Sequence, residues 1–287
     1  MSHSSWGRVR SFLEAIKFSH SIFALPFALS AAVLAAEDLP ELPLVGKIVL
    51  ACVCARTAAM AFNRFADADI DARNPRTADR AIPAGQLSRG FMLGATVVSA
   101  AGFVATAYWI NSLAFQLSPI ALVVLLGYSY TKRFTSLSHV VLGIALGFSP
   151  VGAWIAVRGE FAVVPVLLGC TVLVWTAGFD VIYACQDCDF DRDNSLHSIP
   201  SRLGVHRSLL LARALHVLTV GLLIALGTLG PYGIPYFVGV AAVTLLLGYE
   251  HYLLRGDDLS RVNLAFFTAN GLVSLFFMTA VVTEIVL

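Results

Sequence analysis

The sequence predicts an all-α fold, a polytopic membrane helical bundle of nine transmembrane helices. Of the 287 residues, 58% are hydrophobic and only 13% are charged, and the mean hydropathy is +0.80. Soluble domains carry about 25% charged residues, so this chain has too few to cover a water-facing surface of its size. The composition argues against a soluble enzyme and a disordered protein. The 19 basic and 18 acidic residues nearly cancel, which indicates no nucleic-acid partner.

Nine apolar runs are long enough to cross a bilayer as helices, which takes about 20 residues. They cover residues 18–36, 43–63, 91–110, 114–131, 138–157, 161–184, 208–229, 233–253 and 263–286. Polar residues, Gly and Pro separate them, most weakly at Asn111-Ser112-Leu113. The first run follows Lys17 but has no clear small-residue cleavage site, so we interpret it as a mature helix and not as a signal peptide.

The distribution of Lys and Arg predicts the orientation in the membrane. Sixteen of the 19 fall on one side of the nine-helix arrangement, Lys47 and Arg158 fall on the other, and Arg56 lies inside the second run. Basic residues concentrate in cytoplasmic loops. We therefore expect an integral protein of a bacterial inner membrane or its equivalent, with the N-terminus and the functional site cytoplasmic and the C-terminus outside.

Half of the acidic residues lie in two short clusters at the cytosolic ends of the second and sixth runs. The first cluster contains three polar residues spaced four apart, which places them on one helix face: Asn63, Asp67 and Asp71. The second, 120 residues later, repeats that spacing: Tyr183, Asp187 and Asp191. We infer a single domain over residues 1–287, built from a duplicated four-helix unit (about 15–135 and 136–255) with a ninth helix added.

Carboxylates four apart on a helix repel one another, and at a membrane end that repulsion is less screened. A hard divalent cation, Mg²⁺ above all, relieves it, because it prefers oxygen ligands and bridges carboxylates to phosphates. The predicted ligands are Asn63, Asp67, Asp71, Asp187 and Asp191. The alternative is that the acids are solvated loop charges paired with Arg64, Arg73, Arg76 and Arg192. That alternative stays open above all for Asp69, Asp189 and Asp193.

Basic residues on the same side indicate the ligand that the cation would hold. Five of them can bind the outer oxygens of a diphosphate: Arg76, Arg80, Lys132, Arg133 and Arg202. A diphosphate in a membrane pocket carries a lipid tail, which points to an isoprenoid diphosphate with its chain among the helices.

These motifs resemble those of the UbiA superfamily of intramembrane aromatic prenyltransferases. Asn63-x-x-x-Asp67-x-x-x-Asp71 is similar to the family's first Asp-rich motif, and Asp180-x-x-Tyr183-Ala-x-x-Asp187-x-x-x-Asp191 to its second. The segment 74–85, Asn-Pro-Arg-Thr-Ala-Asp-Arg-Ala-Ile-Pro-Ala-Gly, resembles a family loop. Tyr128-Ser-Tyr-Thr-Lys132-Arg133 resembles the 4-hydroxybenzoate polyprenyltransferase branch. Arg64, His197 and the Cys188-Asp189-Phe190 stretch depart from it, and resemble a side branch that includes naphthoate enzymes of menaquinone synthesis.

The resemblance implies a Mg²⁺-dependent transferase of ubiquinone or menaquinone biosynthesis. Its substrates would be a polyprenyl diphosphate and an aromatic hydroxy acid, and its chemistry an electrophilic aromatic substitution in which a carboxylate or the departing diphosphate takes the ring proton. The catalytic residues would be Asn63, Asp67, Asp71, Tyr183, Asp187 and Asp191. Substrate binding would fall to Arg56, Arg76, Arg80, Tyr128, Lys132, Arg133, Asp180 and His197. We interpret the scattered histidines, His139 among them, as interfacial or packing residues that form no ligand set.

Arg56 is the basic residue that we place inside a span. It precedes Asn63 by seven residues, two helical turns, and so shares the face of the first motif. An Arg in hydrocarbon is costly unless it is paired or hydrated. Arg56 therefore either binds the carboxylate of the acceptor or forms a structural ion pair with Asp180.

Two other classes remain as alternatives. One is another UbiA-type enzyme, which makes haem O, chlorophyll or an archaeal-type lipid. The other is a cation-coupled transporter, because intramembrane acids and duplicated helices also mark such proteins. Against the transporter, the acids gather at one membrane face and the repeat keeps one orientation.

Overall fold

The computed structural model describes residues 5–17 and 23–287, and this part of the chain is helical, without strands. The helices are α1 (Ser5–Ala15), α2 (Leu25–Ala36), α3 (Leu42–Arg73), α4 (Arg89–Ile110), α5 (Ser112–Thr131), α6 (Ser138–Arg158), α7 (Val163–Ala184), α8 (Cys188–Asp193), α9 (Ile199–Leu203), α10 (Val205–Leu229), α11 (Ile234–Leu253), α12 (Val262–Leu264) and α13 (Asn270–Val286). Short 3-10 turns follow α7 (Cys185–Asp187) and α11 (Arg255–Asp257), and a π-helical turn (Ala265–Ala269) precedes α13. The predicted all-α class is confirmed.

Eight helices of the described chain are long and apolar enough to cross a membrane. They match the second to ninth apolar runs. The first run, 18–36, corresponds to α2, which has only 12 residues and begins with a Pro near its N-terminus. Residues 18–22 of that run lie outside the described residues, so the count of nine spans stays a prediction.

Capping residues end the helices at the polar residues and glycines between the apolar runs. Asn111 stops α4 and starts α5, because its side chain accepts a hydrogen bond from the N–H of Ala114 at 2.8 Å. This weak boundary of the sequence is therefore a sharp one in the structure. Gly159 ends α6 in the left-handed conformation (φ 72°), which glycine adopts without steric cost.

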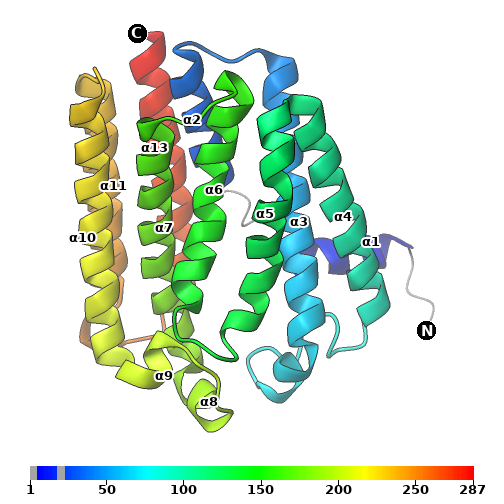
Figure 1. Cartoon of the computed structure of the whole chain (residues 1–287). Coiled ribbons are helices and arrows are strands. Elements are labelled where there is room, and N and C mark those ends of the chain that lie inside the picture. Colours follow the sequence, from blue (N-terminus) through cyan, green and yellow to red (C-terminus); the bar gives the residue numbers. More distant parts are fainter. Residues whose placement is uncertain (1–4, 18–22) are drawn as a thin grey trace.

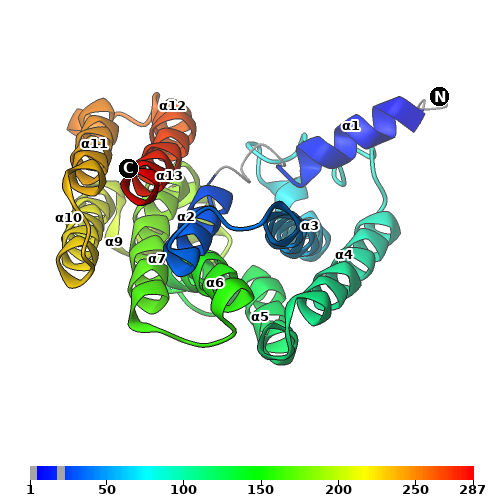
Figure 2. The same cartoon turned by 90° about the horizontal axis from the view of Figure 1, so that it is seen from above.

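The long helices run roughly along one axis, and α1 lies across it at the edge of the bundle (Figures 1 and 2). The largest apolar core joins α2, α6, α7, α10, α11 and α13. Within it α6 and α7 approach closely, because a Cβ on Gly143 would lie 2.4 Å from the carbonyl oxygen of Leu173. Many large apolar side chains elsewhere remain exposed, among them Val98 and Leu245, which suits helices that face lipid.

A buried polar network fastens the second half of the bundle. The indole N–H of Trp175 donates to Asn270 Oδ1 at 2.8 Å, and Asn270 Nδ2 donates to Glu250 Oε1 at 2.9 Å. His216 Nδ1 lies 3.0 Å from His251 Nε2. Glu250 Oε2 makes no hydrogen bond in the described chain and lies 3.5 Å from His216 Nδ1. These contacts link α7, α10, α11 and α13.

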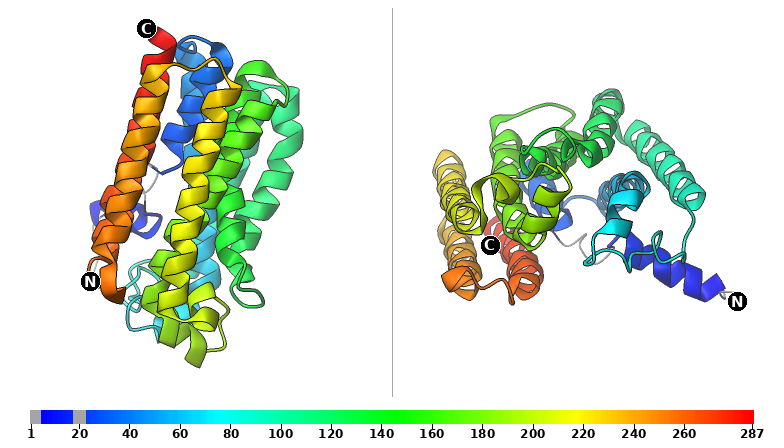
Figure 3. Two further views of the ribbon diagram at one scale, coloured as in Figure 1. Left: turned by 90° about the vertical axis from the view of Figure 1, so that its left-hand side faces the viewer. Right: turned by 90° about the horizontal axis from the view of Figure 1, so that it is seen from below.

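The loop after α3 and the short helices α8 and α9 lie at the same end of the bundle, opposite the C-terminus (Figures 1 and 3). Both Asp-rich clusters therefore meet at one end.

Candidate functional site

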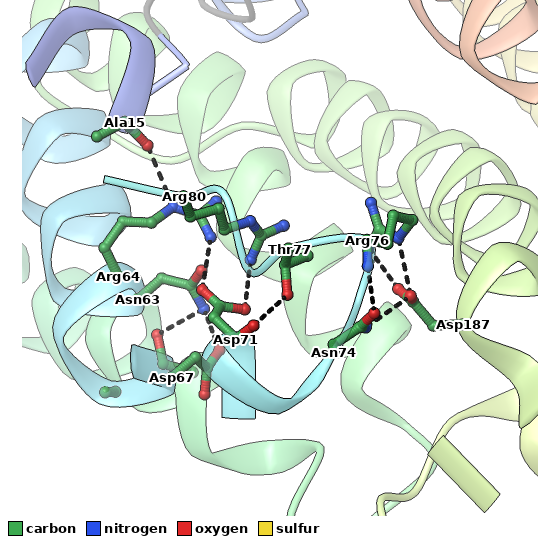
Figure 4. A network of polar contacts seen from close by, with 12 residues as sticks. Ala15, Asn63, Arg64, Asp67, Asp71, Asn74, Arg76, Thr77, Arg80 and Asp187 are labelled. Carbon is green, nitrogen blue, oxygen red and sulfur yellow. Dashed lines mark hydrogen bonds and ion pairs between the residues drawn. The ribbon is translucent and has the colours of Figure 1, made fainter. Parts of the chain in front are cut away.

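The first Asp-rich cluster sits on the last turns of the unbroken helix α3. Asn63 Nδ2 donates to Asp67 Oδ2 at 2.9 Å, one turn further along. Asp71 is buried and accepts hydrogen bonds from two guanidinium groups, Arg80 at 2.7 Å and Arg64 at 3.4 Å. Figure 4 shows these side chains gathered on one face, as the spacing predicted.

The second cluster does not lie on one continuous helix, and our prediction of a regular four-residue spacing is wrong there. Helix α7 ends at Ala184, a 3-10 turn covers Cys185–Asp187, and α8 begins at Cys188. Asp187 and Asp191 are both buried. The break coincides with contacts that the carboxylate of Asp187 makes to the first half of the chain.

The loop after α3 supplies those contacts. Asn74 Nδ2 and Arg76 Nε donate to Asp187 Oδ1 at 2.9 and 2.8 Å, and Arg76 Nη2 donates to Oδ2. The same guanidinium donates to the hydroxyl of Tyr183 at 3.1 Å and stacks over its ring. Burial lowers the pKa of Arg76, but its hydrogen bonds to Asp187 outweigh burial and hold the pKa above its usual value.

Arg76 and Arg80 therefore join the two clusters, because they are four residues apart and hold Asp187 and Asp71 respectively (Figure 4). Thr77, between them, donates to the carbonyl of Asp71 at 3.0 Å and fixes the loop against the end of α3.

The end of α5 adds two more cations. Lys132 Nζ lies 2.8 Å from Asp191 Oδ1, and the side chain of Asp191 is fully buried (0% exposed). Arg133 donates to Asp67 Oδ1 at 3.3 Å and to the carbonyl of Ala66 at 2.6 Å. The backbone N–H of His197 donates to the carbonyl of Lys132 at 2.7 Å, so the backbone of His197 lies directly beside the end of α5.

The exposed acids of the two clusters behave as solvated charges. Asp69 pairs with Arg89 and Asp189 with Arg192, and all four side chains are exposed. This fits the alternative that the sequence left open for Asp69 and Asp189. Arg73 bonds the carbonyl of Asp69 and no carboxylate in the described chain.

The donor chemistry of the cluster fits a hard divalent cation. Among the described residues no three His, Cys, Asp or Glu side chains converge on one point, and each of the four predicted carboxylate ligands is paired with a base. However, Asp191 Oδ2 is buried without a hydrogen-bond partner in that part of the chain. An unpaired buried carboxylate oxygen is costly and is the kind of ligand that Mg²⁺ takes.

Deeper in the bundle the structure separates Arg56 from Asp180. Arg56 Nη2 donates to the carbonyl of Lys17 at 3.1 Å, and its buried Nε has no partner among the described residues. Asp180 pairs with His139 instead, at 2.7 Å. The ion pair between Arg56 and Asp180 that we weighed is therefore not formed. His139 is buried, as a packing residue would be, and it also holds Asp180.

Tyr128 lies in the last turn of α5, and its backbone carbonyl accepts a hydrogen bond from the hydroxyl of Thr131 at 2.6 Å. Two residues with contacts to the site were not singled out from sequence, Asn74 and His139. Asn74 lies in the quoted loop next to Arg76, whereas nothing in the sequence around His139 marks it.

Comparison with known proteins identifies the family. Residues 24–278 match the UbiA prenyltransferase family. The chain is 31% identical over 235 residues to a protein of Vibrio cholerae named 4-hydroxybenzoate octaprenyltransferase, with 82% of each chain covered. A solved apo structure of a UbiA homologue from Aeropyrum pernix K1 is 33% identical, with a TM-score of 0.84 over 92% of this chain and 98% of that one.

A third relative shares the fold at lower identity. It is a UbiA homologue from Archaeoglobus fulgidus, solved with GPP and Mg²⁺, with 18% identity and a TM-score of 0.77 over 96% of this chain and 100% of that one. This chain therefore belongs to the UbiA prenyltransferase family, and it is an integral membrane protein.

Proposed function

We propose that this protein transfers a polyprenyl group from a polyprenyl diphosphate to 4-hydroxybenzoate, in ubiquinone biosynthesis. The observation that carries the proposal is the loop of Asn74, Arg76 and Arg80, which brings the carboxylates of both Asp-rich clusters to one end of the bundle. The name of the Vibrio cholerae relative supports the acceptor.

The site residues would exchange partners when the diphosphate binds. In the structure each of the four predicted carboxylate ligands has a basic partner: Asp67 has Arg133, Asp71 has Arg80 and Arg64, Asp187 has Arg76, and Asp191 has Lys132. A diphosphate would attract the basic side chains through its outer oxygens. The carboxylates thus released, with Asn63, would hold Mg²⁺. The bound cation supplies Lewis-acid stabilisation of the charge that develops on the departing diphosphate.

The rest of the site would place the two reacting carbons. The prenyl chain would lie among the apolar helices, below the cations, where the bilayer excludes water from the allylic cation. Tyr183, Phe179 and Phe266 form an aromatic cluster beside Arg76, with Tyr183 and Phe266 centroids 4.5 Å apart. Their faces would stabilise that cation.

Arg56 would bind the acceptor carboxylate. Its position two turns from Asn63 is about 10 Å deeper in the membrane, at 1.5 Å per residue. Its free Nε offers one unused donor, and a planar guanidinium binds a carboxylate through two parallel hydrogen bonds.

The proposed protein would have its N-terminus and site on the cytoplasmic side and its C-terminus outside. The basic site loops and the C-terminus lie at opposite ends of the bundle, which supports this topology (Figure 1). Residues 15–135 and 136–255 would be the two copies of the duplicated unit.

The test is to incubate the purified protein in lipid vesicles with labelled octaprenyl diphosphate and a panel of acceptors, with Mg²⁺ or with EDTA. We expect prenylated 4-hydroxybenzoate with Mg²⁺ and none with EDTA. Product on a hydroxynaphthoate alone would assign the protein to menaquinone synthesis. No covalent product with any acceptor would contradict the proposal and favour a transporter.

Arg56→Lys tests the acceptor end separately. Lysine keeps the charge but loses the planar fork, so we expect the KM for the aromatic acid to rise by about tenfold, equivalent to about 1.4 kcal/mol. The KM for the prenyl diphosphate should stay within about twofold, because Arg56 lies far from the diphosphate cations. Equal rises in both KM values would contradict this role.

A further inference from the structure

The pair of Asp180 and His139 differs from every acid–base pair around it. Asp180 lies on α7, and His139 lies at the start of α6. His139 Nδ1 is 2.7 Å from Asp180 Oδ2, and the histidine side chain is 4% exposed against 25% for the aspartate. His139 Nε2 accepts the backbone N–H of Ile199, the first residue of α9, at 3.3 Å.

These two contacts assign the histidine proton. A backbone N–H can only donate, so Nε2 must carry a lone pair and no proton. The single ring proton is then on Nδ1, where it is donated to Asp180. His139 is therefore a neutral hydrogen-bond donor in this arrangement, and it leaves one oxygen of Asp180 unengaged by the pair.

His139 leaves Asp180 an oxygen outside the pair, unlike the partners of three neighbouring acids. Both carboxylate oxygens of Asp67, Asp71 and Asp187 accept hydrogen bonds from other side chains. Asp191 lies against the ammonium group of Lys132. His139 contacts only Oδ2 of Asp180, so it orients the carboxylate and leaves Oδ1 for a proton.

Asp180 also lies at the depth where an aromatic acceptor would react. It precedes Tyr183 by three residues, so the two share a helix face about 4.5 Å apart along the axis. Tyr183 contacts Arg76 at the diphosphate end. Asp180, on α7, precedes Asp187 by seven residues, and Arg56 precedes Asp67 by eleven on α3, about 10 and 16 Å at 1.5 Å per residue. In depth, Asp180 thus lies between the Asp-rich end and Arg56, the group proposed for the acceptor carboxylate.

We propose that Asp180 is the base that removes the ring proton of the aromatic acceptor, and that His139 is its positioning residue. The bond between the prenyl C1 and the diphosphate oxygen breaks with its electron pair on the diphosphate, and the ring carbon bonds to C1. The C–H bond at that ring carbon then breaks. Its electron pair restores aromaticity, and its proton moves to the free oxygen of Asp180. This inference rests on the proposed prenyl transfer.

The decisive experiment compares an acceptor deuterated at the attacked ring carbon with the unlabelled one. In the native protein a positioned base makes proton loss fast, so we expect little isotope effect on the prenylation rate. Asp180→Asn keeps the shape and still accepts the His139 hydrogen bond, but it has lost the base. Its rate should fall by about 10²-fold or more, and a primary isotope effect should appear. An Asp180→Asn protein with near-native turnover and no isotope effect would overturn the inference.

A second pair of variants keeps the test informative if Asp180→Asn is poorly folded. Asp180→Glu and Asp180→Gln have the same length and differ only in basicity. Glu should recover at least about tenfold over Gln, and equal rates would overturn the inference. Asp69→Asn, on the exposed surface, is the control with unchanged rate and isotope effect.

His139 is tested by rescue. Gln can donate to Asp180 and accept from Ile199, whereas Leu can do neither. His139→Leu should therefore show the new isotope effect and His139→Gln a smaller one, and two identical isotope effects would remove His139 from the proposal. If the native protein makes no prenylated product with any acceptor, the proposed function itself fails. If the native protein is active and the Asp180→Asn variant is equally active, only the role of Asp180 fails.

Discussion

The two Asp-rich clusters resemble each other in sequence but are held in different ways. The first lies on the continuous helix α3, and residues of the first half, Arg64, Arg80 and Arg133, contact its acids. The second lies across a break between α7 and α8, and its acids are held by residues from the other half, Asn74, Arg76 and Lys132. The first cluster can therefore form locally, whereas the second is complete only after the two halves have docked.

The largest effect should come from the acids themselves, and it should be the same in both clusters if they share one metal and one diphosphate. Asp67→Asn, Asp71→Asn, Asp187→Asn and Asp191→Asn should each lower turnover by roughly a hundredfold or more, about 3 kcal/mol in the barrier. The measurement is the prenylation rate at saturating substrates. A large loss in one cluster only would show that the clusters are not chemically equivalent.

The next largest effects should come from the basic partners of the acids, and they should differ between the two clusters. Arg76→Ala leaves Asp187 without its charged partner and should lower the rate by about 10²-fold. Arg80→Ala leaves Arg64 on Asp71 and should cost only about tenfold, because one guanidinium remains. The ratio of the two rates, with expression in the membrane as the control for folding, measures how far each half supports its own acid. Equal losses would contradict the difference in support.

The helix that carries the second cluster is also packed more tightly than the one that carries the first. Gly143→Ala on α6 would place its methyl 2.4 Å from the carbonyl oxygen of Leu173 on α7, and such overpacking costs about 1–3 kcal/mol. Gly46 on α3 has no atom within 4 Å of an added Cβ, so Gly46→Ala should be neutral or stabilising by up to about 1 kcal/mol. Thermal unfolding in detergent should separate the two variants, and a lower unfolding temperature for Gly46→Ala would contradict the difference in packing.

The smallest effect belongs to the exposed acids of each cluster. Asp69 and Asp189 form surface ion pairs with Arg89 and Arg192, and such pairs contribute about 0–1 kcal/mol. Asp69→Asn and Asp189→Asn should leave the rate and the Mg²⁺ dependence unchanged. A change in Mg²⁺ affinity in either variant would place that residue among the ligands.

Features that depend on neighbours in the chain could be predicted from the sequence. Hydropathy located the spans from the second to the ninth run, because a lipid environment demands apolar side chains and internal backbone hydrogen bonds in each helix separately. The helical repeat placed Asn63, Asp67 and Asp71 on one face, since α3 is unbroken there. The motif residues were also sufficient to indicate the family.

Features that depend on contacts between distant segments could be seen only in the tertiary structure. Asn74 and Arg76 lie more than 100 residues from Asp187, and their hydrogen bonds to it accompany the break at Cys185–Asp187 that a helical repeat cannot reveal. His139 lies 41 residues from Asp180, and neither carries a local signal of the other. Spacing in the sequence shows which side chains share a face of one helix. A buried charge, in contrast, pairs with whichever opposite charge or hydrogen-bond donor the fold brings within reach. The partner of each charged group is therefore decided by which helices pack together.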